Sequence, residues 1–180
     1  MATSYRQVLR CLQGRTRGGA DFSDEEYDEA ATIARLESND GLLPLHWHLV
    51  CRLFACCYQG AYTEAADAGR RAFELVALSS TFSHALANYL YLPIALLLDW
   101  ENLSDEQQTE ATRQIDACLD KLGGFAEDNV GHVRALINAE RYRIANKTLE
   151  AEEAYHTAID LAHAHGAIHV EALACERVAR

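Results

Sequence analysis

Glutamate and histidine side chains lie close together near the C-terminus, where their spacing could place metal ligands on one helix. Glu153 and His156 are three residues apart, which puts a carboxylate and an imidazole on the same helical face. This is half of a di-iron site in a helical bundle, and the site would need a second Glu-x-x-His and two more glutamates. We find no second copy and expect these two side chains to lie on a solvated face.

Three more histidines, His163, His165 and His169, are crowded around Gly166. His165 and His169 have the i, i+4 spacing of a metal-binding pair, but only on an unbroken helix. Gly166 favours a helix end, because glycine readily adopts the left-handed conformation that terminates helices. We therefore expect a helix C-terminus here, where positive charge is favoured by the helix dipole, and no metal site.

The remaining reactive side chains lack the spacing of a catalytic centre. The six cysteines have no C-x-x-C spacing and lie within apolar helical patterns, which is typical of small core residues in a reducing compartment: Cys11, Cys51, Cys56, Cys57, Cys118 and Cys175. The sequence contains no G-x-x-x-x-G-K-[ST] phosphate loop and neither HRD nor DFG. We expect no catalytic, cofactor-binding or metal residues in this segment, which is not an enzyme by itself.

Composition and charge narrow the class of protein further. The 180 residues include 30 Ala, 23 Leu and only 2 Pro, a composition that favours helices. A net charge of -11 opposes capture of nucleic acid or anionic membrane. The longest apolar run, Tyr89 to Leu98, is too short for a membrane-spanning helix. We expect a cytoplasmic protein without membrane insertion.

Helix start signals and apolar periodicity predict about nine helices. Ser23 with Glu26, and Ser104 with Gln107, form capping-box patterns, and Pro44 suits the first turn of a helix. The loop Gly14 to Phe22 contains three glycines. The predicted helices cover residues 2–13, 23–38, 43–59, 62–78, 82–100, 104–122, 126–145, 148–165 and 167–180.

Two of the helical segments resemble each other and the tetratricopeptide repeat. In YQGAYTEAADAGRRAFEL, Gly60 turns the chain, Tyr62 wedges the helix pair, and Ala65 and Ala72 permit close approach. In ANKTLEAEEAYHTAIDLA, Asn146 stands where the turn glycine would be. The two copies are 86 residues apart, so one longer helix pair must lie between them.

The repeats predict an all-α fold, a right-handed α-solenoid of tetratricopeptide-like antiparallel helix pairs. It forms one domain over 1–180, with capping helices in 1–42, three helix pairs in 43–165 and the start of a further helix in 166–180. The last helix keeps an apolar stripe up to Arg180, so we expect these residues to belong to a longer chain. The repeat-packing positions are Gly60, Tyr62, Ala65, Ala72, Ala139, Tyr142, Ala151, Tyr155 and Ala158.

The stretches GRTRGGADFSDEEYDEA, YQGAYTEAADAGRRAFEL and the C-terminal AERYRIANKTLEAEEAYHTAIDLAHAHGAIHVEALACERVA carry a family resemblance. They resemble the helical-repeat segment of large bacterial signalling proteins, which join a protein-kinase-like domain and a predicted ATPase to a GAF or PAS sensor histidine kinase. The resemblance implies a connector or partner-sensing role between catalytic modules. Kinase and ATPase activities would then belong to the rest of the parent chain.

The positions that face the concave groove of such repeats give the candidate interaction surface. On the helix 43–59 they are apolar, so we expect this face to be covered by one of the first two helices or by a second subunit. On the helix 126–145 they include polar residues, so an open polar surface is expected there. The surface comprises Trp47, Val50, Phe54, Tyr58, His84, Asn88, Tyr91, Glu140 and Arg143.

The function predicted from these patterns is protein–protein interaction or signal relay within a larger regulator, with a protein as partner and a possible homo-oligomer. An alternative is a small-molecule sensor with an internal pocket between the third, fifth and seventh helices, lined by Trp47, Phe54 and Tyr91. A helical-bundle metalloenzyme is a third interpretation.

Overall fold

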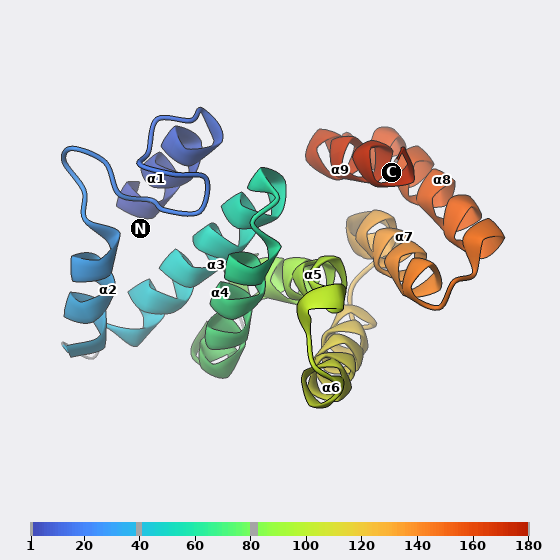
Figure 1. The fold of residues 1–180 in the computed structure, drawn as a ribbon, viewed down its shortest axis with the longest axis horizontal. Helices are drawn as coiled ribbons and strands as arrows, with labels where there is room; N and C mark the ends of the chain where they lie inside the picture. Colours follow the sequence, from blue (N-terminus) through green and yellow to red (C-terminus); the bar gives the residue numbers. More distant parts are fainter. Residues whose placement is uncertain (1, 39–40, 80–82, 180) are drawn as a thin grey trace. The chain divides into compact units, whose positions relative to one another are not determined.

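The computed structural model describes residues 2–38, 41–79 and 83–179, and this part of the chain is all-α (Figure 1). It divides into two compact units, Met1–Ala95 and Leu96–Arg180, whose boundary falls within helix α5. The helices of the described residues are α1 (Ala2–Leu12), α2 (Glu29–Ser38), α3 (Leu42–Gln59), α4 (Tyr62–Leu75), the 3-10 helix η1 (Val76–Ser79), α5 (Ser83–Leu98), the 3-10 helix η2 (Trp100–Asn102), α6 (Asp105–Leu122), α7 (Glu127–Ile144), α8 (Thr148–Ala164) and α9 (Ile168–Val178).

Most helix boundaries match those predicted from the sequence to within a few residues. The capping box of α6 is confirmed, because the Ser104 hydroxyl accepts a hydrogen bond from the Gln107 N–H and the Gln107 side chain accepts one from the Ser104 N–H. The prediction that a helix begins at Ser23 is wrong. Here α2 begins at Glu29, and the Asp28 carboxylate caps it by accepting from the Ala31 N–H.

Residues 23–28 form a turn because their own side chains compete for the backbone N–H groups. The Asp24 carboxylate accepts hydrogen bonds from the N–H groups of Glu26 and Tyr27, and the Ser23 hydroxyl accepts one from the Glu29 N–H. Such short-range bonds offer the chain an alternative to a helix. The amide of Gln7 on α1 donates to Asp24, so this turn is also fastened to the first helix.

Glu29 links α2 and the loop that precedes it to α3 within the first unit. Its buried carboxylate accepts from the Phe22 N–H, is paired with Arg52 and lies 3.0 Å from His48 Nε2. Burial raises the pKa of this carboxyl, but hydrogen bonds from His48, Arg52 and Phe22 outweigh that effect and leave the pKa below its usual value. The charged form of Glu29 therefore stabilises the fold.

Helix turns in both units share one geometry. Gly60 at the end of α3, Asn146 after α7 and Gly166 after α8 all have positive φ, with values of 73°, 57° and 67°. In each case the following N–H returns to a carbonyl five residues earlier, at Cys56, Tyr142 and Ala162. The sequence-based placement of Asn146 at a turn position and of Gly166 at a helix end is confirmed.

Small side chains lie where helices approach each other. α3 packs on α4, and α7 packs on α8, which in turn packs on α9. Five alanines of the predicted repeat-packing positions are buried, as is Tyr155, and Tyr62 is half-buried: Ala65, Ala72, Ala139, Ala151 and Ala158. Tyr142 was placed in this packing wrongly, since it is exposed, with the Lys147 ammonium 5.8 Å from its ring centre.

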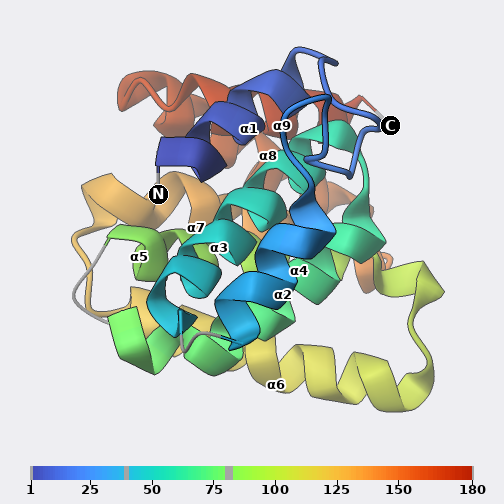
Figure 2. The same ribbon diagram turned by 90° about the vertical axis from the view of Figure 1, so that its left-hand side faces the viewer.

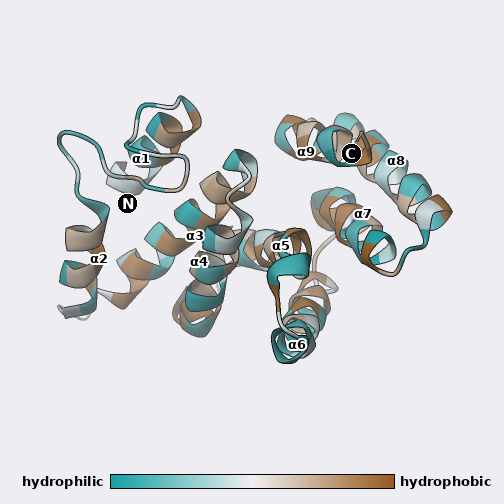
Figure 3. Cartoon of the chain, viewed as in Figure 1, coloured by the Kyte–Doolittle hydropathy of each residue, from teal (hydrophilic) through white to brown (hydrophobic). Residues whose placement is uncertain are grey.

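The first unit is organised around α3, which is covered on several sides. Figure 2 shows α1 and α2 lying along α3, and both pack on it. Val8 and Cys11 of α1 join Phe22, Cys51 and Ala55 in one apolar cluster, while Figure 3 shows the apolar character of α3 and α5. Trp47 and Phe54 of the predicted groove face pack, half-buried, against this cluster, so the first helix covers part of that face.

Replacing Gly60 by Ala tests the turn geometry. A Cβ at this position meets no atom within 4 Å, so Gly60→Ala isolates the backbone strain of a φ of +73°. We expect the free energy of unfolding to fall by about 1 kcal/mol. Gly18→Ala, which is equally uncrowded and lacks a positive φ, is the control and should change it by less than about 0.5 kcal/mol. Urea denaturation followed by Trp47 fluorescence in a Trp100→Phe background measures both.

The lowered pKa of Glu29 predicts a specific acid sensitivity. In the folded protein the pKa of Glu29 lies below its ordinary value of 4.5. The stabilisation by charged Glu29 is therefore complete above pH 4.5 and is lost as the pH falls through the folded pKa. Glu29→Gln should lose about 2 kcal/mol of stability at pH 7 and show a flatter dependence of unfolding free energy on pH below about 4.5. Glu26→Gln, exposed in a 3.6 Å pair with Arg6, is the control. An unchanged pH dependence in Glu29→Gln would contradict this role.

Candidate functional site

The two units contain matching sets of three helices, offset by 86 residues. Adding this offset converts α3, α4 and the first part of α5 into α7, α8 and α9, and it relates the turn at Gly60 to the turn at Asn146. Phe54 then corresponds to Glu140, Cys57 to Arg143 and Tyr91 to Arg177. The candidate residues of the two units can therefore be compared position by position.

In the first unit these positions form an aromatic cluster. The ring of Phe54 meets that of Tyr91 edge to face at 5.1 Å between centres and lies 4.8 Å from that of Tyr58. Trp47, Phe54 and Tyr58 are half-buried. Four other residues predicted as interaction surface are buried: Val50, His84, Asn88 and Tyr91.

An apolar pocket of about 340 Å³ lies beside this cluster, among α1, α3 and α5. The small-molecule interpretation expected a pocket between the third, fifth and seventh helices, lined by Trp47, Phe54 and Tyr91. Trp47 and Phe54 line this one, but neither Tyr91 nor a residue of α7 does. The centre of the Trp47 ring lies 5.3 Å from the ring centre of Tyr5 on α1 and 4.4 Å from that of His84 on α5. Burial lowers the pKa of His84, so the walls of this pocket carry little charge.

In the second unit the corresponding positions form a cluster of charges around Glu140. This carboxylate is completely buried and accepts hydrogen bonds of 2.7 Å from Arg143 Nε, Arg177 Nε and the Tyr155 hydroxyl. Arg177 Nη2 adds a longer contact of 3.4 Å. A buried carboxylate requires such partners, because its removal from water is otherwise strongly unfavourable. The prediction of Glu140 as part of an open polar surface is therefore wrong.

At one matching position of α4 and α8 the two units have side chains of very different size. Gly69 on α4 lies so close to α5 and α3 that a Cβ would come within 2.9 Å of Leu92 and 3.2 Å of Leu53. Its counterpart on α8 is Tyr155, whose ring and hydroxyl reach Glu140. At these matching positions the first unit has Phe54, Tyr91 and Gly69, and the second has Glu140, Arg177 and Tyr155.

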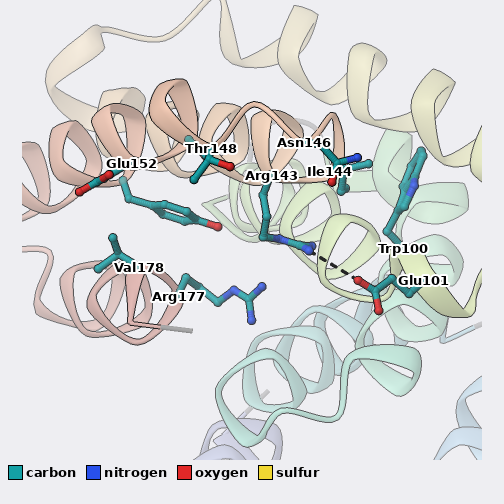
Figure 4. A pocket seen from close by; sticks show the side chains of 11 residues that line it. Trp100, Glu101, Arg143, Ile144, Asn146, Thr148, Glu152, Arg177 and Val178 are labelled. Carbon is teal, nitrogen blue, oxygen red and sulfur yellow. Dashed lines mark ion pairs between the residues drawn. The ribbon is translucent and has the colours of Figure 1, made fainter.

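The Glu140 cluster forms part of a pocket of about 710 Å³ in the second unit, which we call the arginine pocket (Figure 4). Its residues come from η2, the end of α7 with the following turn, the first half of α8 and the end of α9: Trp100, Glu101, Arg143, Ile144, Asn146, Thr148, Ala151, Glu152, Tyr155, Arg177 and Val178. Asn146, with its positive φ of 57°, forms the turn between α7 and α8 at this point.

Positive charge lies in the middle of the arginine pocket and negative charge at its two ends. Arg143 and Arg177 point into the same space, while Glu101 and Glu152 stand on opposite sides of them (Figure 4). Arg143 donates to the Leu97 carbonyl at 3.2 Å, and its Nη1 lies 3.8 Å from the carboxylate of Glu101. Arg143 is thus shared between Glu140 and Glu101, while Arg177 pairs with Glu140.

Titratable side chains in and outside the arginine pocket have pKa values raised by burial. In the pocket, burial and the adjacent Glu140 raise the pKa of Tyr155, whose hydroxyl donates a hydrogen bond to that carboxylate.

Two cysteines outside the pocket are also unreactive. Burial raises the pKa of Cys51 and of Cys118 to about 12, so these thiols stay protonated. Within residues 2–38, 41–79 and 83–179, no group of three or more His, Cys, Asp or Glu is arranged to hold a metal ion.

Reasoning from the sequence missed seven of the eleven pocket residues: Trp100, Glu101, Ile144, Thr148, Glu152, Arg177 and Val178. Arg177 lies on the last helix, 37 residues after Glu140, and no local motif joins them. The signal that would have found it is the offset of 86 residues from Tyr91, which was already a candidate. Trp100 follows α5 in η2 and carries no recognisable spacing to the other residues.

Comparisons with known proteins give no identity for the chain. No protein-family model, curated protein or solved structure matches it. None of the described helices is long and apolar enough to cross a membrane.

Substitution of Glu140 tests whether the charge cluster maintains the second unit. In Glu140→Gln two guanidiniums lose their buried counter-charge, so we expect the free energy of unfolding to fall by about 3 kcal/mol. Urea denaturation followed by Trp100 fluorescence in a Trp47→Phe background measures the change. Glu110→Gln, which removes an exposed 2.9 Å pair with Arg113, should change it by less than about 0.5 kcal/mol. Equal effects of the two substitutions would contradict the assigned role of Glu140.

Proposed function

We propose that the chain is a non-catalytic protein-interaction segment of a larger regulator and that the arginine pocket is its docking site. The observation that carries the proposal is the pocket itself, a space of about 710 Å³ in which Arg143 and Arg177 meet the apolar side chains of Trp100, Ile144 and Val178. Such a combination of apolar walls with a few fixed charged groups is typical of binding sites. A segment of another protein is the proposed occupant.

The matching helix sets support a repeat architecture for this docking role. We propose that the pairs α3/α4 and α7/α8 are units of a right-handed α-solenoid, since both have buried alanines 86 residues apart and the same left-handed turn. Repeat proteins of this kind present extended surfaces to partners. The resemblance to helical segments of bacterial signalling proteins supports a relay role between catalytic modules.

The chemistry of the pocket favours docking over catalysis. Tyr155 donates its proton to Glu140, and both arginines use their Nε groups to hold the same carboxylate. A nucleophile activated by an adjacent base is not among the pocket residues, which include one threonine hydroxyl, Thr148, as their only aliphatic alcohol. The groups that remain can orient a bound segment through charge and apolar contact.

Site-specific photocrosslinking tests this function. A benzoylphenylalanine at the exposed pocket position Thr148 should crosslink to a protein in living source cells, whereas the same residue at exposed Thr109 on α6 should not. The Thr148 crosslink should be lost when Arg143→Gln is added, because the docking charge is then removed. Equal crosslinking from the two positions, or a Thr148 crosslink insensitive to Arg143→Gln, would contradict docking in the pocket.

A further inference from the structure

We propose that the arginine pocket binds a peptide stretch in which one acidic side chain is flanked by basic side chains. The inference rests on the proposed docking function and specifies the chemistry of the partner. It follows from the order of charges along the pocket, in which a positive centre lies between two negative ends (Figure 4).

The centre of the pocket is built to receive a carboxylate. Arg177 is held in place by two contacts with Glu140 and has a side chain only 9% exposed, while Arg143 is 32% exposed and therefore reachable. Arg143 turns Nε toward Glu140, which leaves its terminal nitrogens toward Leu97 and Glu101. Guanidiniums fixed in this way bind carboxylates with charge-assisted hydrogen bonds.

Glu101, the acidic neighbour of Arg143 at the exposed side of the pocket, interacts with Arg143 only weakly. Glu101 is 88% exposed, and its carboxylate approaches Arg143 Nη1 only to 3.8 Å, beyond hydrogen-bond distance. An exposed pair at such a separation contributes little to stability. An incoming carboxylate can therefore take the place of Glu101 at Arg143 without breaking a strong bond.

The two ends of the pocket are suited to cations. Glu101 and Glu152 are largely exposed, and Glu152 has a 4.0 Å contact with His156. Basic side chains on either side of the bound carboxylate would pair with these two glutamates. The net charge of -11 also attracts a stretch with more basic than acidic residues and would repel a purely acidic one.

The apolar side chains of the pocket favour particular residues next to the acidic residue of the bound peptide. Trp100 and Ile144 lie on the side of Glu101, and Val178 lies on the side of Glu152 (Figure 4). Aliphatic residues beside the acidic one would cover these surfaces. The proposed stretch thus alternates charge and includes an aliphatic side chain.

Blocked pentapeptides provide the test, with Trp100 fluorescence in Trp47→Phe protein as the signal. Acetyl-Lys-Ala-Glu-Leu-Lys-amide should bind, and replacing its Glu by Gln should weaken binding about tenfold, as expected for the loss of charge-assisted hydrogen bonds. Replacing both Lys by Ala should weaken it about threefold. Raising the salt concentration should reduce both differences.

Protein variants assign these differences to individual side chains. Arg143→Gln should remove the difference between the Glu and Gln peptides, whereas Arg113→Gln, which changes an exposed arginine of α6 outside the pocket, should keep it. Glu152→Gln changes an exposed residue, so it leaves the fold intact and should reduce the difference between the Lys and Ala peptides.

The outcomes separate this inference from the docking function. Equal affinities of the Glu and Gln peptides, or no binding of either, would overturn the assigned charge order. If the Thr148 crosslink to a protein persisted in that case, docking in the pocket would stand and its chemistry would be different. A Glu-over-Gln preference that survives Arg143→Gln would also overturn the inference.

Discussion

A carboxylate fully removed from water must find its counter-charges within the fold, and at Glu140 they come from two separate helices. Arg143 lies one turn further along α7, and Arg177 lies on α9. Tyr155 of α8 completes the set, so one side chain contacts all three helices of the C-terminal set. Because the guanidiniums are oriented by Glu140, the same cluster also gives the arginine pocket its positive centre.

The two units show how one helical arrangement carries different chemistry. At the position of Glu140 and Arg177 the first unit has Phe54 and Tyr91, which pack edge to face at 5.1 Å. Aromatic contacts need no counter-charge, so the first unit can leave an apolar pocket beside them. Placing Glu140 in the second unit instead requires both arginines, and the space next to them becomes polar.

Much of the helical organisation was predictable because its signals are local. The Ser104–Gln107 capping box and the turns at Gly60, Asn146 and Gly166 all follow from a few adjacent residues. The start of α2 was not predictable from its capping pattern, because Asp24 also bonds to Gln7 of α1. A contact between distant residues decided between a turn and a helix.

The site was harder to predict than the helices for the same reason. The sequence pattern selected Glu140 and Arg143, and their i, i+3 contact was foreseeable. It could not show that Glu140 is buried, since that depends on Arg177 and Tyr155 from two other helices. Internal repetition is the one long-range signal in the sequence, and it relates Arg177 to Tyr91.

Replacing two charged residues of the second unit by the aromatic residues at the matching positions of the first tests most directly whether Glu140 and Arg177 act as a pair. The double variant Glu140→Phe with Arg177→Tyr copies Phe54 and Tyr91 into the second unit, and its unfolding free energy can be compared with those of the single variants. The account predicts that the double variant is more stable than either single variant, with a favourable coupling above about 1 kcal/mol. Additive losses in the double variant would show that the two positions are not equivalent and would contradict it.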